Sequence, residues 1–112
     1  MPDCLFCKIV GKQVPASVVY EDDKVLAFND IAPQAPTHIL VIPKEHISAL
    51  ASVTDHAILA EVFRIVNQLA REKGLVAKGF RTVINNGRAA GQAVDHLHVH
   101  LLGGRDFNWP PG

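Results

Sequence analysis

The sequence has no excess charge of either sign and no long apolar run. It contains 11 basic and 11 acidic side chains among 112 residues, so its formal net charge is zero. That balance argues against a dedicated nucleic-acid or anionic-membrane binder, because such proteins carry a basic patch. No segment approaches the roughly eighteen apolar residues of a membrane span, and no cationic leader precedes an apolar run at the start. We therefore expect a cytoplasmic protein with neither a membrane nor a nucleic-acid partner.

Cysteine is also scarce. The two cysteines, Cys4 and Cys7, are too few for a disulfide scaffold and too close together to staple the chain. A Cys-x2-Cys pair is half of a metal site, and a redox pair or two inert thiols are the alternatives. The pair leaves these three alternatives open.

The remaining composition is that of one ordinary globular domain covering residues 1–112. With 48% hydrophobic and 20% charged residues, the chain can form a single core. Apolar spacing predicts a short helix within 4–10 and a long helix over 55–73, with Thr54 as its N-cap and Gly74 as its stop.

Strand signals outnumber helix signals. β-branched and aromatic runs predict strands at 17–21, 24–28, 38–42, 80–85 and 93–102. Short connections between them favour antiparallel pairing. The predicted fold class is α+β, with a five-stranded antiparallel sheet, one long helix and a short N-terminal helix.

Three alternate histidines, His96, His98 and His100, lie in the last predicted strand. Alternate residues of a strand share a face, so the three imidazoles would face one side and the intervening apolar residues the other. Three roles are open for these histidines: they are polar residues that face solvent, they form a metal-centred site, or they catalyse nucleophilic attack on phosphorus. The glycine-containing loop 85–92 just before the strand favours the last, because glycines let backbone N–H groups approach a phosphate closely.

The motif His96-Leu-His-Val-His-Leu-Leu102 resembles the signature of the histidine triad superfamily. Further segments resemble its nucleotide-binding branch, over nearly the whole chain: Phe28 to His38, Val41 to Lys44 with His46, Gly91-Gln92, Gly103 to Arg105 and Trp109 to Gly112. The resemblance implies the fold of that family and hydrolysis of purine nucleoside phosphoramidates, releasing AMP or GMP.

The resemblance also implies roles for single residues. His98 would be the nucleophile that carries the nucleotide, His100 would contact phosphate, and His38 would approach the leaving group. A carbonyl in the Gly91-Gln92 turn would accept a hydrogen bond from His98. The candidate catalytic residues are His38, His96, His98 and His100.

The implied nucleotide-binding residues include an apolar base pocket and Asp30, which would accept from the ribose hydroxyls. The whole set is Leu5, Phe6, Ile9, Phe28, Asp30, Ile31, Asn85, Gly91, Gln92, Ala93, His98, His100 and Trp109. Ala93 departs from the family, in which a serine often donates a hydrogen bond near the leaving nitrogen. The alternative function is therefore a nucleotide-binding module with little turnover.

Two further expectations come from the resemblance. Cys4, Cys7, His46 and His96 would bind zinc as a closed structural set, although a zinc-dependent hydrolase is a third alternative for the function; no organic cofactor is expected. The chain would form a homodimer, with the tail 104–112 and its Trp109 docking near the interface.

Overall fold

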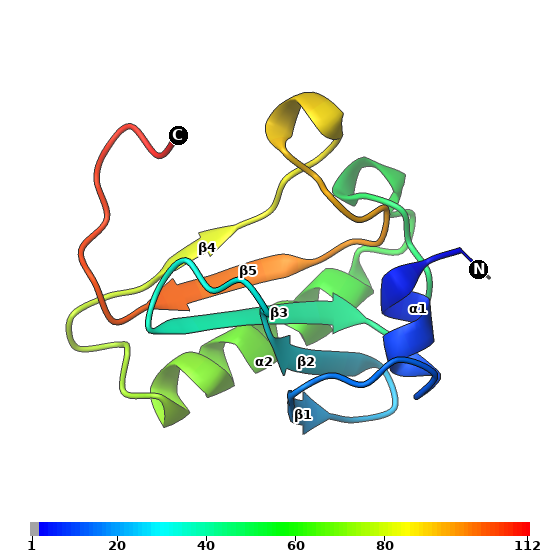
Figure 1. The fold of residues 1–112 in the computed structure, drawn as a ribbon, viewed down its shortest axis with the longest axis horizontal. Helices are drawn as coiled ribbons and strands as arrows, with labels where there is room; N and C mark the ends of the chain where they lie inside the picture. The colour runs from blue at the N-terminus through cyan, green and yellow to red at the C-terminus, as the bar shows by residue number, and fades with distance from the viewer. Residues whose placement is uncertain (1–2) are drawn as a thin grey trace.

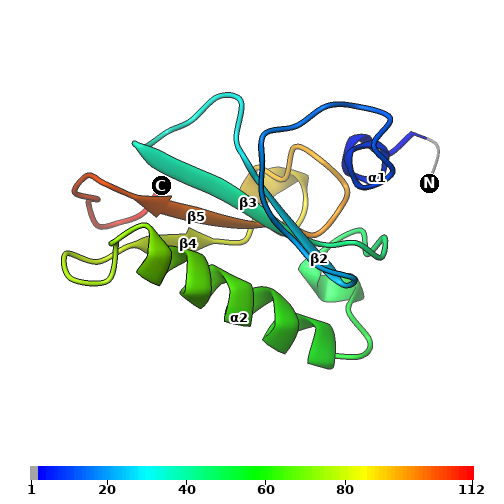
Figure 2. The same ribbon diagram turned by 90° about the horizontal axis from the view of Figure 1, so that it is seen from below.

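The long helix of this protein runs along one face of the sheet, and a short N-terminal helix lies at one end of the opposite face (Figures 1 and 2). The structure is a computed structural model that describes residues 3–112. Its helices and strands are α1 (Leu5–Val10), β1 (Val18–Glu21), β2 (Val25–Asn29), β3 (Thr37–Pro43), α2 (Ala57–Glu72), β4 (Arg81–Val83) and β5 (Val99–Gly103). The five strands of this part of the chain form one antiparallel sheet in the order β1-β2-β3-β5-β4. The predicted fold class is confirmed.

Successive side chains of the central strands point to opposite faces of the sheet, so each face carries an apolar layer. Val25, Ile39 and Val99 point to the face that packs against α2, whereas Leu26 and Leu40 point to the face covered by α1. Because β2 and β3 are buried on both faces, they are nearly continuous apolar runs. Within residues 3–112, no helix is long and apolar enough to cross a membrane.

The start of the long helix differs from the sequence expectation. The helix begins at Ala57, and the Asp55 carboxylate, not Thr54, accepts the Ala57 N–H at 3.1 Å. Thr54 is therefore not the N-cap. The predicted stop is confirmed, because Gly74 has a φ of 71°, which a glycine adopts without steric strain.

The histidine segment also differs, because β5 begins only at Val99. Val41 pairs with Val99, so continued pairing would place Pro43 opposite Leu97. Pro43 has no N–H to donate, and its carbonyl accepts from the His96 ring at 2.8 Å. The ladder therefore ends there, and residues 94–98 are not strand.

β4 is also shorter than the predicted strand 80–85, because it covers only Arg81–Val83. Val83 pairs with His100, so continued pairing would place Asn85 opposite His98, which lies before β5 begins. Pairing therefore cannot extend to Asn85.

Candidate active site and metal-ligand cluster

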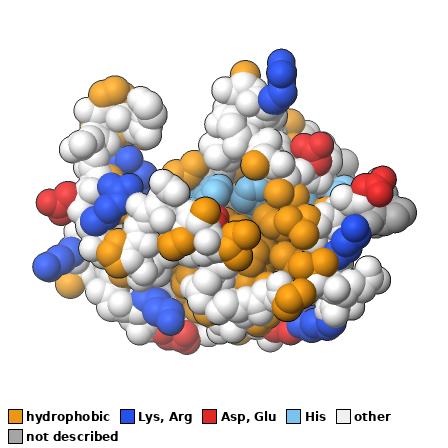
Figure 3. Space-filling model, viewed as in Figure 1, with side chains coloured by type: hydrophobic (Ala, Val, Ile, Leu, Met, Phe, Trp, Pro, Cys, Tyr) orange, Lys and Arg blue, Asp and Glu red, His pale blue; other side chains and the backbone are white. Residues whose placement is uncertain are grey.

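A hollow of about 320 Å³ lies on the α1 face of the sheet. Nine predicted nucleotide-binding residues line it: Leu5, Phe6, Ile9, Phe28, Asp30, Ile31, Ala93, His98 and His100. Figure 3 shows histidine side chains at the centre of this face, bordered by hydrophobic side chains on the side where α1 lies. The Phe6 ring meets Phe28 and His98 edge-on, with ring centroids 5.3 and 5.2 Å apart. The hollow thus has an apolar wall and a histidine edge.

His98 has its proton position fixed by the backbone. Its Nδ1 lies 2.7 Å from the carbonyl oxygen of His96, and a carbonyl can only accept. In the neutral ring the proton therefore sits on Nδ1, which leaves a lone pair on Nε2. The expectation that a Gly91-Gln92 carbonyl orients His98 is wrong, because the carbonyl two residues before His98 does so.

The proton positions of His38 and His100 follow in the same way from their hydrogen-bond partners. The backbone N–H of Gln34 donates to Nδ1 of His38 at 3.0 Å, so the proton of neutral His38 is on Nε2. That Nε2 lies 2.9 Å from Nδ1 of His100 and donates to it. His100 consequently carries its own proton on Nε2, where it is a donor.

Burial favours the neutral form of both rings of this pair. Burial lowers the pKa of His100 to about 4, with the nearby His98 and His38 rings adding to the shift and Asp30 opposing it. Burial also lowers the pKa of His38, again against the Asp30 carboxylate. The neutral forms of His38 and His100 can each donate a hydrogen bond from Nε2.

Asp30, His38 and His100 bring three ligand atoms within 4.8 Å of one another, as a metal site would. The hydrogen bond from Gln34 nevertheless keeps a proton on Nε2 of His38, the nitrogen that faces the other two residues. A metal ligand needs a lone pair at that nitrogen. This trio does not fit a metal ion; Asp30 instead accepts from Ala32 N–H at 2.8 Å and lies 3.5 Å from His38.

The predicted zinc ligands do converge. Cys4 Sγ lies 3.3 Å from His96 Nδ1, and Cys7 Sγ lies 3.2 Å from His46 Nδ1 and 3.6 Å from His96 Nδ1. A tetrahedral zinc ion with usual bond lengths holds sulfur and nitrogen about 3.5 Å apart. His96 uses its Nε2–H on the Pro43 carbonyl, which leaves the Nδ1 lone pair facing both thiols. The four side chains therefore fit zinc, and the fully buried His96 ring belongs to this cluster.

Four predicted nucleotide-binding residues do not line the hollow: Asn85, Gly91, Gln92 and Trp109. The Gln92 amide bonds to three backbone groups instead. Trp109 is 83% exposed at the end of a tail that Arg81 and Arg105 hold against the same chain. Its contact with a second copy stays a prediction.

The hollow also has walls that the sequence reading did not single out: Val14, Pro15, Ala16, Asn29, Leu40 and Val94. Leu40 lies directly opposite His100 in the β3–β5 ladder. A sequence analysis that aligned these two strands in this register would have placed Leu40 at the hollow. The segment 14–16 carries no local signal, since only the packing of α1 brings it to the hollow.

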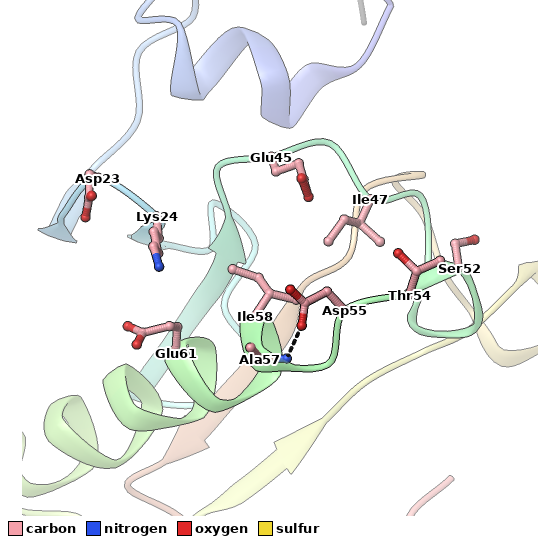
Figure 4. Close-up of a pocket in the computed structure, with 10 residues that line it drawn as sticks. All are labelled: Asp23, Lys24, Glu45, Ile47, Ser52, Thr54, Asp55, Ala57, Ile58 and Glu61. Carbon is pink, nitrogen blue, oxygen red and sulfur yellow. Dashed lines mark hydrogen bonds between the residues drawn. The ribbon is translucent and has the colours of Figure 1, made fainter.

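A second hollow of about 450 Å³ lies between the β1–β2 turn, the loop after β3 and the start of α2 (Figure 4). Asp23, Lys24, Glu45, Asp55 and Glu61 are among its lining residues, and no histidine or cysteine is. The serine, threonine and lysine side chains that line it have no histidine beside them to act as a base, so the histidine hollow is the candidate active site.

Comparison with known proteins gives the family. A family model described as HIT domain matches residues 11–107 of the chain. The chain belongs to the HIT domain family. Histidine-triad nucleotide-binding proteins are among its relatives.

Three relatives match nearly the whole of this HIT domain. An uncharacterised HIT-like protein of Synechococcus elongatus is 54% identical over 98% of this chain and 97% of its own length. A 14 kDa zinc-binding protein of Zea mays is 51% identical over 96% and 87%. An adenylylsulfatase named HINT1 from Arabidopsis thaliana is 49% identical over 96% and 76%.

Solved structures agree with the fold. A HIT family hydrolase from Legionella pneumophila superposes with a TM-score of 0.96 at 50% identity, covering 98% of this chain and 100% of that one. A histidine triad nucleotide-binding protein from Candida albicans gives 0.84 at 32% identity, covering 98% and 85%. The whole architecture of this chain is thus shared with these proteins.

From the lowered pKa of His100 we predict how the free energy of unfolding depends on pH. The unfolded chain binds a proton at His100 near pH 6.5, whereas the folded protein resists it until about 4. Folding free energy should therefore be lost as the pH falls through this window. Urea denaturation at several pH values should show a shallower loss in His100→Gln, which keeps an acceptor for His38. The exposed His56→Gln is the matched control, and equal slopes in wild type and His100→Gln would refute the assignment.

Proposed function

We propose that this protein hydrolyses purine nucleoside phosphoramidates through a covalent nucleotidyl-His98 intermediate. The observation that carries the proposal is the unprotonated Nε2 of His98 at the edge of an apolar hollow, next to a proton-bearing Nε2 of His100. A nucleophile with a fixed lone pair and an adjacent donor is the arrangement that attack on phosphorus requires. The purine would lie against Phe6 and its apolar neighbours, with Asp30 near the ribose.

The reaction would proceed in two displacements. The Nε2 lone pair of His98 attacks phosphorus, the P–N bond to the amine breaks, and the amine leaves after taking a proton from water. Positive charge on the modified imidazole is stabilised by the carbonyl of His96, and His100 donates to a phosphate oxygen. Water then attacks phosphorus, which releases AMP or GMP and restores His98.

A second substrate class is favoured by Ala93, which lines the hollow and cannot donate a proton. An amine must be protonated to leave, whereas sulfate leaves as a stable anion. The relative named adenylylsulfatase supports the same class. Adenosine 5′-phosphosulfate is therefore the second candidate substrate, cleaved by the same attack of His98.

We also propose that Cys4, Cys7, His46 and His96 hold a structural zinc ion. Bound there, zinc would supply a rigid link between α1, the loop after β3 and the histidine segment. Four protein ligands complete a tetrahedron, so no position is left for a reactive water. The metal would brace the site and take no part in the displacement.

The nucleophile is tested by His98→Ala. Wild type should release AMP from adenosine 5′-phosphoramidate, and His98→Ala should be slower by about a thousandfold or more, because no covalent adduct can form. His56→Ala, an exposed histidine, is the control and should retain the wild-type rate. If wild type releases no more AMP than His98→Ala yet binds AMP, the protein is a nucleotide-binding module and the proposal fails.

The leaving-group argument is tested by Ala93→Ser. The added hydroxyl should raise turnover of the phosphoramidate by about 10- to 100-fold, because it can donate to the leaving nitrogen. Turnover of adenosine 5′-phosphosulfate should change little, since sulfate needs no proton. Steady-state rates on both substrates give the comparison, and an equal gain on both would contradict the argument.

The metal is tested by elemental analysis of purified protein. One zinc ion per chain is expected in wild type and none in Cys7→Ala, which loses one of four ligands. Zinc removal by a chelator should lower the unfolding temperature, because bound metal stabilises only the folded state. Folded, zinc-free protein should still release AMP; loss of turnover without unfolding would favour the zinc-dependent hydrolase instead.

A further inference from the structure

The segment 94–98 carries both His96 and His98, yet it lies outside the sheet. Two backbone bonds hold it locally: His96 N–H to the Val94 carbonyl at 2.9 Å, and Leu97 N–H to the Ile47 carbonyl at 2.7 Å. Catalysis through His98 needs its Nε2 to be held in place. The buried His96 ring anchors the middle of the segment on the Pro43 carbonyl, and side-chain amides of the preceding loop hold its start.

Gln92 bonds through both ends of its amide to backbone groups of three segments. Its Oε1 accepts the Gly87 N–H at 2.8 Å, and its Nε2 donates to the carbonyls of Ser48 at 2.8 Å and Val94 at 3.0 Å. Both amide protons and one acceptor position are thereby used. The side chain ties the start of the histidine segment to the loop after β3 and to the turn at 87–91.

Asn86, just before the turn at 87–91, makes a further contact with the loop after β3. Its Oδ1 accepts the Ala51 N–H at 2.7 Å, next to the contact that Gln92 makes with Ser48. The contact between Asn86 and Ala51 brings the loop before the helical turn at Arg88–Ala90 close to the helical turn at Leu50–Ser52. The loop after β3 is thus a fixed support for the histidine segment.

A shift of the segment 94–98 would change the position of His98 itself. The Nδ1–H of His98 donates to the carbonyl of His96, which is two residues from the Val94 carbonyl that Gln92 holds. If Val94 moves, the His96 carbonyl shifts, and the His98 ring loses the partner that fixes its proton. A shift of about 1 Å in a reacting group can lower a rate by about a hundredfold.

We propose that Gln92 is a positioning residue for His98, acting through the Val94–His96 backbone, and that its side chain makes no nucleotide contact. This inference rests on the proposed function for its kinetic consequence. Its structural part concerns the free protein and stands by itself.

The test compares Gln92→Ala and Gln92→Met with Gln68→Ala. Gln68 is a matched control, because its amide bonds only to Glu72 on the surface of α2. Both Gln92 variants should lose about 10- to 100-fold in kcat for AMP release, with KM within about threefold of wild type. A raised KM with unchanged kcat would show that Gln92 binds the nucleotide, which overturns the proposal.

A spectroscopic readout separates positioning from general destabilisation. Long-range ¹H–¹⁵N correlation spectra report which ring nitrogen of a histidine carries the proton. Wild type and Gln68→Ala should show His98 protonated on Nδ1, whereas both Gln92 variants should show a mixture of tautomers while still folded. An unchanged His98 signature in folded Gln92 variants overturns the inference, whatever their melting temperatures.

The two proposals fail in different ways. If wild type does not turn over any nucleotide substrate, the proposed function fails, and the His98 spectra alone decide the role of Gln92. If wild type is active and both Gln92 variants match it in rate and spectrum, the positioning role fails while the proposed function stands.

Discussion

Backbone groups that can only donate or only accept determine which nitrogen of each histidine is available. The carbonyls of Pro43 and His96 accept from His96 and His98, and the Gln34 N–H donates to His38. From these three contacts the proton positions of four rings follow, including that of His100 through its bond with His38. The path of the main chain therefore determines which nitrogen of each ring donates and which accepts.

Most of the fold could be predicted from periodicity, because both faces of β2 and β3 are buried and α2 has a clear apolar stripe. What could not be predicted was where the β3–β5 ladder ends. The alternating pattern of residues 93–102 is that of a strand, and it continues past the point at which pairing stops. The cause is Pro43 on the neighbouring strand, 56 residues away from Val99 in sequence, and a local pattern contains no information about such a partner.

In the site, too, the residue types could be predicted from the sequence, whereas the contacts that depend on the path of the backbone could not. The apolar wall, Asp30 and the histidines were predictable, because a resemblance in residue type carries over position by position. The partner of His98 and the contacts of Gln92 were not, because they depend on which carbonyls point inward. A glutamine before a histidine segment suggests a ligand contact; only the folded loop shows that its amide is already bonded to three backbone groups of the chain.

The early end of the ladder also separates the histidines. His96, His98 and His100 keep a common face, since Phe6 meets both His96 and His98 and the His98 and His100 rings lie 5.1 Å apart. Within that face the Pro43 carbonyl holds the His96 ring toward Cys4, Cys7 and His46, away from the hollow. Had Pro43 been a residue with an N–H, pairing could extend to Leu97 and His96 would lie on a regular strand. One proline thus both shortens the strand and directs His96 to the metal-ligand cluster, which leaves His98 and His100 at the hollow.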